Sequence, residues 1–158
     1  MRKPVFKFYL YSVILAEAVG GLSALLSRSG RIRYLATAVQ PRFSPPAIVF
    51  PIVWGILYAL MGISAAMVYL SPNSSFRRKG LNLYVVQLIF NFFWSLIFFN
   101  AMAFLPALIW LMLLWGIVLW MISQFREVNL LAAALQIPYL LWLTFAGYLN
   151  DCVWLLNP

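Results

Sequence analysis

The stretch from Ser44 to Gly62, "SPPAIVFPIVWGILYALMG", is apolar enough to enter a lipid bilayer, although it begins with two prolines and contains a third at Pro51. The apolar run continues to Leu70 without a charged residue. A hydrocarbon core about 30 Å thick is crossed by about 20 helical residues at 1.5 Å each. The stretch therefore predicts a membrane-spanning helix that begins beside the prolines, where a missing N–H is tolerated.

The rest of the chain has the same character. Hydrophobic residues make up 65% of the 158 positions and charged residues 9%, against roughly half and a quarter in soluble domains. The runs with few or no charges predict an all-α integral membrane protein, a bundle of five transmembrane helices in one domain, residues 1–158. The helices are expected at about 6–26, 47–70, 81–99, 105–122 and 129–154, with a long loop at 27–46.

The N-terminus permits a second interpretation, a removable signal peptide. The leader "MRKP" is basic, and Ala16, Glu17 and Ala18 have the small-x-small form of a cleavage site. However, Lys7 interrupts the apolar run early, and apolar residues continue beyond Ala18. These features favour a retained first helix.

The net charge of +8 arises from 11 basic and 3 acidic residues. Because the basic residues gather at the ends of spans, they are expected to meet anionic headgroups and to orient the chain, and no nucleic acid is expected as a partner. The side of the N-terminus carries seven of them, Arg2, Lys3, Lys7, Arg77, Arg78, Lys79 and Arg126, and the first loop carries four, Arg28, Arg31, Arg33 and Arg42. This bias predicts a cytoplasmic N-terminus and a C-terminus on the opposite side.

Several kinds of chemistry are disfavoured by composition. The chain has no histidine, which removes imidazole catalysis and histidine ligation of metal or haem iron. Its one cysteine, Cys152, has no partner for an intrachain disulfide, and its three acids supply neither a carboxylate pair nor a proton relay. We therefore expect no metal site and no required cofactor, and neither a hydrolase nor an ion pump.

Aromatic and amide side chains recur at helical spacing in three of the spans. The stripes are Phe50, Trp54, Tyr58 and Met61 in the second span, Tyr84, Gln87, Asn91, Trp94 or Ser95, and Phe98 in the third, and Tyr139, Trp142, Ala146 and Asn150 in the fifth. Amides in hydrocarbon need partners, so the stripes are predicted to face the interior of the bundle. Hydrogen bonding between helices is an alternative to ligand binding for these groups.

The tryptophans also differ in position between the spans. Trp54, Trp94 and Trp142 lie several residues inside their spans, where an interfacial aromatic belt does not explain them. The fourth span also contains tryptophans but nothing polar, and it is predicted to be a lipid-facing scaffold.

Three long motifs in order give the whole chain a resemblance to a known family. They are "PRFSPP" with "FPIVWGILYALMG", "LYVVQLIFNFFWSLIFF", and "PYLLWLTFAGYLNDCVW". On these residues the chain resembles the TspO/MBR family of tryptophan-rich sensory proteins, which includes the mitochondrial translocator protein, or peripheral benzodiazepine receptor. The resemblance implies a five-helix bundle, commonly dimeric, with a ligand cavity closed by the first loop.

The resemblance also implies ligands and the residues that bind them. Family ligands are porphyrins such as protoporphyrin IX, haem, sterols and synthetic isoquinolines and benzodiazepines. With Phe50 included from its stripe, matching motif positions place the ligand among Phe50, Trp54, Tyr58, Gln87, Asn91, Trp94, Tyr139, Trp142 and Ala146, under a lid containing Tyr34, Pro41 and Pro45. Some bacterial members degrade protoporphyrin in light, which the resemblance assigns to Trp54 and Trp142.

This sequence departs from the family pattern in places. The lid has Tyr34 followed by Leu35 where an aromatic pair is common, and Phe43 where a tryptophan is common. No basic residue follows Tyr148, so the sterol-recognition pattern of animal members does not carry over. Glu17 is outside the pattern, and its role stays open.

Three classes of function follow. The first is a membrane receptor or transport-type protein for tetrapyrroles and related hydrophobic small molecules, surrounded by lipid and expected to be a homodimer. The second is an enzyme that degrades porphyrin with light or oxygen. The third is a small-molecule exporter or a membrane scaffold. Porphyrin titration in the dark separates the first from the third, and product analysis after illumination separates the second from the first.

Overall fold

The computed structural model describes residues 3–158, and Arg2, which contributes to the predicted orientation, lies outside the described residues. The elements are α1 Lys3–Leu26, α2 Arg28–Thr37, α3 Val49–Tyr69, α4 Ser75–Ser95, the π-helix η1 Leu96–Asn100, α5 Phe104–Arg126, α6 Leu130–Ala134 and α7 Ile137–Leu156. Among the residues described, five helical segments are long and apolar enough to cross a membrane. The predicted bundle of five spans is confirmed.

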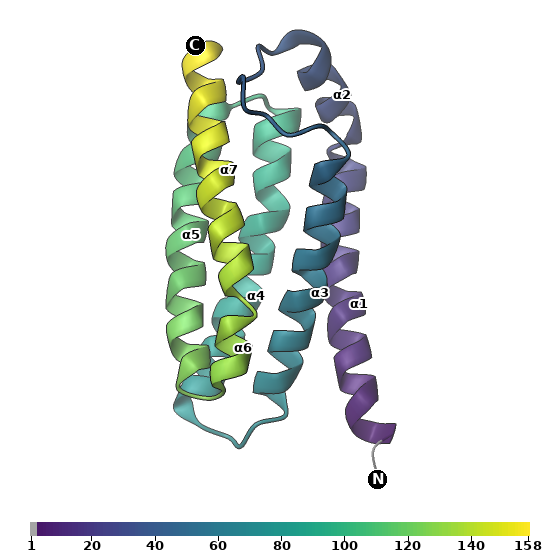
Figure 1. The fold of residues 1–158 in the computed structure, drawn as a ribbon, viewed down its shortest axis with the longest axis vertical. Helices are drawn as coiled ribbons and strands as arrows, with labels where there is room; N and C mark the ends of the chain where they lie inside the picture. The colour runs from purple at the N-terminus through teal and green to yellow at the C-terminus, as the bar shows by residue number, and fades with distance from the viewer. Residues whose placement is uncertain (1–2) are drawn as a thin grey trace.

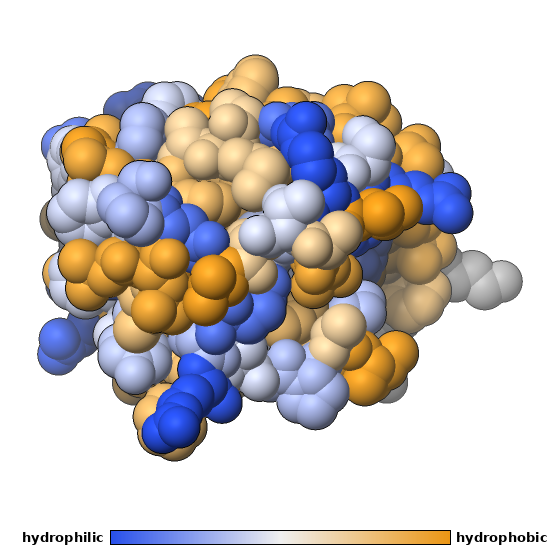
Figure 2. Space-filling view, turned by 90° about the horizontal axis from the view of Figure 1, so that it is seen from above, coloured by the Kyte–Doolittle hydropathy of each residue, from blue (hydrophilic) through white to orange (hydrophobic). Residues whose placement is uncertain are grey.

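The helices run side by side along the long axis of the molecule (Figure 1). Helix α1 packs mainly against α3, α4 against α5, and α5 against α7. The N-terminus lies at one end, and α2, the following loop and the C-terminus lie at the other, which we call the lid end (Figure 1). Seen from above, the lid end mixes hydrophilic and hydrophobic residues, as expected where a bundle leaves the lipid tails (Figure 2).

The start of α3 agrees with the prediction that the helix begins beside the prolines. The helix begins at Val49, so Pro51 is in its first turn, where the backbone N–H has no partner within the helix. At the start of the helix, the N–H of Val49 donates to the carbonyl of Pro46 at 2.9 Å. The prolines thus shape the entry of the chain into the bundle without breaking α3.

The first connection is not the continuous loop that was expected over residues 27–46, because α2 occupies half of it. Gly30 lets α2 lie directly on η1: a Cβ atom there would be 2.6 Å from the backbone oxygen of Phe99 and would also collide with the side chain of Asn100. Any larger residue would push α2 away from the bundle. The lid is therefore a docked helix followed by an irregular segment.

Two other predicted boundaries are corrected. Helix α4 begins at Ser75, six residues before the predicted start at 81, because the Ser74 hydroxyl caps it by accepting from the N–H of Arg77 at 3.1 Å. The fifth span, predicted as one helix over 129–154, is divided into α6 and α7. Pro138 has no N–H for the carbonyl of Ala134, which weakens the helix at this point.

The prediction that the fourth span is a lipid-facing scaffold is wrong for one face of α5. That face is buried against α4, α6 and α7 and consists of Ala107, Leu111, Leu114, Val118, Met121 and Phe125. The Trp110 indole N–H donates to the carbonyl of Phe90 at 2.7 Å, and that of Trp115 to the Thr144 hydroxyl at 2.9 Å. Membrane helices can associate through apolar packing alone, so the lack of polar residues did not predict lipid exposure.

Candidate ligand-binding site

The aromatic stripes of α3 and α7 meet in one cluster. The ring centroid of Trp54 lies 5.5 Å from that of Tyr58 on its own helix, and 6.2 Å and 6.5 Å from those of Tyr139 and Trp142 on α7. Phe50 contacts Trp142 edge to face at 5.9 Å. Such edge-to-face arrangements are favourable for aromatic pairs. We call these five residues the aromatic cluster.

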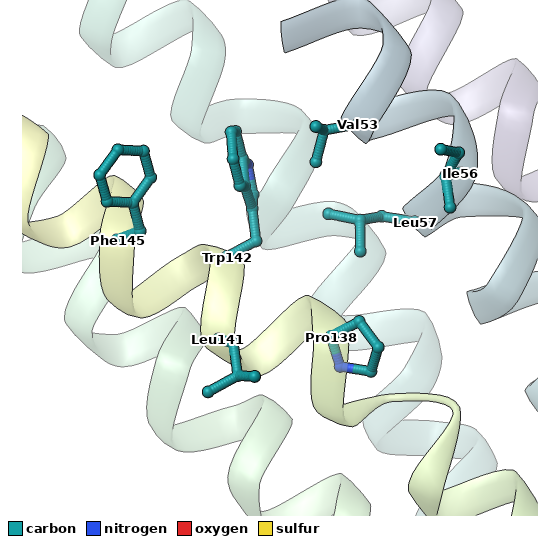
Figure 3. Close-up of a pocket in the computed structure, with 7 residues that line it drawn as sticks. All are labelled: Val53, Ile56, Leu57, Pro138, Leu141, Trp142 and Phe145. Atoms are coloured by element: carbon teal, nitrogen blue, oxygen red, sulfur yellow. The ribbon is translucent and has the colours of Figure 1, made fainter. Parts of the chain in front are cut away.

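An apolar recess lies beside the aromatic cluster, between α3 and α7. Its volume is about 500 Å³, within the usual range of small-molecule pockets. Val53 and Leu57 of α3 face Trp142 of α7 across it (Figure 3). The recess is lined by Val53, Ile56, Leu57, Pro138, Leu141, Trp142 and Phe145. Ile56 and Leu141 are exposed on its rim, so in a membrane the recess opens toward the lipid tails.

A chain of buried hydrogen bonds joins α4 to α7 and α3. Asn91 Nδ2 donates to the Tyr139 hydroxyl at 2.8 Å, and that hydroxyl donates to Gln87 Oε1 at 2.8 Å. Gln87 Nε2 lies 3.8 Å from the sulfur of Met61. The prediction that the amides face the interior is confirmed. Their partners are other helices, so in this structure they stabilise the bundle.

A second group of aromatic residues lies toward the lid end. Trp94 stacks on Phe98 with centroids 5.1 Å apart, and its indole N–H donates to Asn150 Oδ1 at 3.3 Å. Tyr34 of α2 packs against Phe98 at 5.2 Å and Phe104 at 6.1 Å. Tyr34 and Trp94 thus both pack on Phe98 at the end of the α4–α5 hairpin. Tyr34 is in a different cluster from Trp54 and Trp142, whereas Trp94 packs against both clusters.

The remaining sequence-predicted residues lie between these groups or in the lid. Pro41 is buried and Pro45 half-buried, while Ala146 is half-buried and packs against the main core. Burial raises the pKa of the Tyr34 phenol, and its hydroxyl donates to Gln40 Oε1 at 3.2 Å.

Sequence reasoning missed Asn157, which holds the lid at its far end. Its side chain accepts from the Val39 N–H at 2.8 Å and donates to the Val39 carbonyl at 3.1 Å. This pair of bonds ties the irregular part of the lid to the end of α7. No periodic signal marks Asn157, because its partner is 118 residues away in the chain.

The electrostatic character of the site is neutral. The side chains of the aromatic cluster and the recess carry no formal charge. Within residues 3–158, no group of three or more His, Cys, Asp or Glu side chains is arranged to hold a metal ion. Such a surface can bind a ligand by stacking and apolar contact, with the indole N–H groups as its polar atoms.

Together, the five apolar spans and the recess define a multi-pass helical membrane protein with an apolar recess open to lipid. The chain belongs to the TspO/MBR family, which matches residues 12–155. The resemblance found in the three motifs is thereby confirmed.

Similar proteins come from bacteria and animals. Tryptophan-rich protein TspO of Chlorobaculum tepidum is 34% identical over 148 residues, covering 91% of this chain and 92% of that protein. Protein CrtK of Rhodobacter capsulatus is 38% identical over 120 residues, 75% of each chain. Translocator protein of Homo sapiens is 38% identical over 126 residues, 78% of this chain and 74% of that protein.

Proposed function

We propose that this protein is a membrane receptor or transport-type protein that binds tetrapyrroles, such as protoporphyrin IX and haem, and related planar hydrophobic ligands. The observation that carries the proposal is the position of Trp142. It forms one wall of the apolar recess and is also packed against Trp54 and Phe50 in the aromatic cluster. A ligand in the recess would therefore touch the cluster directly.

The recess suits a flat, lipid-soluble ligand. An indole face stacks on a macrocycle and loses little conformational entropy in doing so. Trp54 and Trp142 already pack edge to face, with their ring centroids 6.5 Å apart. A macrocycle therefore does not fit between them unless a ring moves. The ligand is therefore expected on the recess side of Trp142, which it would reach from the bilayer without crossing the polar lid end.

The names of relatives agree with this class of function without specifying a ligand. One relative is named Translocator protein and another Tryptophan-rich sensory protein, which describe translocation and sensing for those proteins. The proposal that this chain binds tetrapyrroles rests on the family resemblance and on the recess beside the aromatic cluster. A homodimer and a cytoplasmic N-terminus belong to the same proposal.

Fluorescence titration tests the proposed site. Protoporphyrin IX added in the dark to the protein in detergent should quench tryptophan fluorescence, with a dissociation constant near the micromolar level, or about −8 kcal/mol. The double variant Trp54→Ala, Trp142→Ala should bind at least about tenfold more weakly, because it loses the stacking wall. Trp120→Ala is the matched control, since Trp120 is exposed on the outer face of α5.

Two results would contradict the site. Equal affinity of the double variant and the parent would place the ligand elsewhere. Equal losses in the double variant and in Trp120→Ala would show an unspecific effect of removing tryptophan. No binding at all in the dark would favour the third class, a small-molecule exporter or scaffold.

Porphyrin degradation is a second candidate, favoured by the direct contact between Trp54 and Trp142 beside Tyr58 and Tyr139. Indoles and phenols are oxidisable side chains, and molecular oxygen would be the oxidant. Illumination of the aerobic complex, followed by chromatography of the pigment, tests this candidate. An open-chain product that forms with the parent but not with Trp54→Phe or Trp142→Phe would support it, and intact porphyrin would exclude it.

A further inference from the structure

The bundle contains a small set of buried polar atoms that no protein group satisfies. Within residues 3–158, buried side-chain atoms without a hydrogen-bond partner are the Tyr84 hydroxyl and both the Nε2 and Oε1 atoms of Gln136. Gln136 is 0% exposed and Tyr84 is 5% exposed. An amide and a phenol without partners are unfavourable in any protein interior and more so within hydrocarbon. These atoms therefore call for a partner that is not part of the chain.

The two side chains lie at the same level of the bundle interior. The bond of 2.8 Å between Tyr139 and Gln87 fixes the register of α7 against α4. Tyr84 lies one turn before Gln87 on α4, and Gln136 lies one turn before Tyr139 at the start of α7. Both helices run toward the lid end (Figure 1). Tyr84 and Gln136 consequently face the same part of the interior from opposite sides.

The break in the fifth span lies at this level. Gln136 occupies the junction between α6 and α7, just before Pro138, which has no N–H. Irregular backbone at membrane depth is tolerated where it is enclosed by protein or lines a hydrated space. A comparison with Gln87 sharpens the point, because that buried amide has a protein partner on each side, Tyr139 and Met61. The Gln136 amide is equally buried but has no protein partner on either side.

The unsatisfied atoms of Tyr84 and Gln136 indicate which kind of group could bind to both. The Gln136 amide offers N–H donors and a carbonyl acceptor, and the Tyr84 hydroxyl offers one donor and an acceptor. The group that fits both must donate as well as accept, and it must be small and uncharged. Water has these properties, and buried waters typically bridge two to four otherwise unsatisfied polar groups.

We propose that Tyr84 and Gln136 bind a water molecule inside the bundle, at the break in the fifth span. This water links α4 to the junction of α6 and α7, one turn below the hydrogen bonds of Tyr139. The site is separate from the aromatic recess and does not depend on tetrapyrrole binding.

Nuclear magnetic resonance of the parent protein tests the site directly. The chain has four glutamines, Gln40, Gln87, Gln124 and Gln136, so selective ¹⁵N-glutamine labelling in micelles yields few side-chain signals. The Gln136 amide, assigned by its loss in Gln136→Met, should show a nuclear Overhauser cross-peak to water. The Gln87 amide is the matched control and should show none. In Tyr84→Phe the Gln136 cross-peak should weaken several-fold, because the water loses one of its anchors.

The outcomes distinguish a Gln136 amide that binds water from one that does not. A missing water cross-peak at Gln136, with the exposed Gln40 amide showing one, would overturn it. So would equal cross-peaks at Gln136 and Gln87, because general water penetration would explain both.

Thermal unfolding is an independent test that uses the same variants. Tyr84→Phe and Gln136→Met should each lower the unfolding midpoint, and the double variant should be no less stable than the less stable single variant, since either change weakens the binding of the same water. A Gln136→Met protein more stable than the parent would show that the amide is dry, and additive losses would show that the two side chains share nothing.

Discussion

Replacing Tyr139 with phenylalanine should weaken the bundle without removing an aromatic ring from the aromatic cluster. The Tyr139 hydroxyl accepts from Asn91 at 2.8 Å and donates to Gln87 at 2.8 Å. Both partners are buried, with exposed fractions of 3% and 0%. The substitution thus removes a single oxygen atom and leaves a donor and an acceptor unsatisfied inside the membrane.

The expected loss follows from these two bonds. Side-chain hydrogen bonds between membrane helices contribute about 0.6 kcal/mol on average and up to about 1.7 kcal/mol, and a buried group left without a partner costs about 1–3 kcal/mol. We therefore expect Tyr139→Phe to lower the free energy of unfolding by about 1–3 kcal/mol. That corresponds to about a 5- to 150-fold shift in the ratio of folded to unfolded protein.

The free energy of unfolding can be measured by titrating dodecyl sulfate into mixed micelles and following helical circular dichroism. Tyr11→Phe is the control, because it makes the same chemical change on a ring of α1 that is 63% exposed. It should change the free energy by less than about 0.5 kcal/mol. Equal effects of the two substitutions would refute the reasoning, since the Tyr139 bonds would then contribute nothing to stability.

Three further substitutions test other contacts. Asn157→Ala should release the lid from Val39 and speed amide hydrogen exchange of residues 38–46 several-fold, with a stability loss below about 1 kcal/mol; unchanged exchange would show that the lid is not held there. Gly62→Ala should lower the free energy of unfolding by about 1–3 kcal/mol, because its Cβ would lie 2.5 Å from the Cα of Val13 and force α1 away from α3; a neutral effect in the same dodecyl sulfate titration would mean that the two helices separate freely. Ala146→Leu should weaken protoporphyrin binding several-fold in fluorescence titration while stability changes little; parallel losses of both would assign Ala146 to helix packing alone.

Much of the architecture could be predicted from individual residues and their spacing. Hydrophobicity over about 20 residues identified the five spans, because transfer into lipid depends on each residue separately. The buried positions of Gln87 and Asn91 were also predictable, since an amide exposed to lipid tails has no partner. Pro51 could be placed in the first turn of α3 for a similarly local reason, the backbone N–H that a first turn does not use.

The tertiary structure decided which of these groups meet. The spacing placed aromatic stripes on three helices, but only packing brought Trp54 to Trp142 and separated Tyr34 from both. The buried face of α5 could not be predicted, because an apolar side chain has nearly the same environment against lipid as against another helix. The unsatisfied amide of Gln136 likewise became visible only in the fold. Hydropathy is a property of each residue, whereas partners depend on distances between segments far apart in the chain.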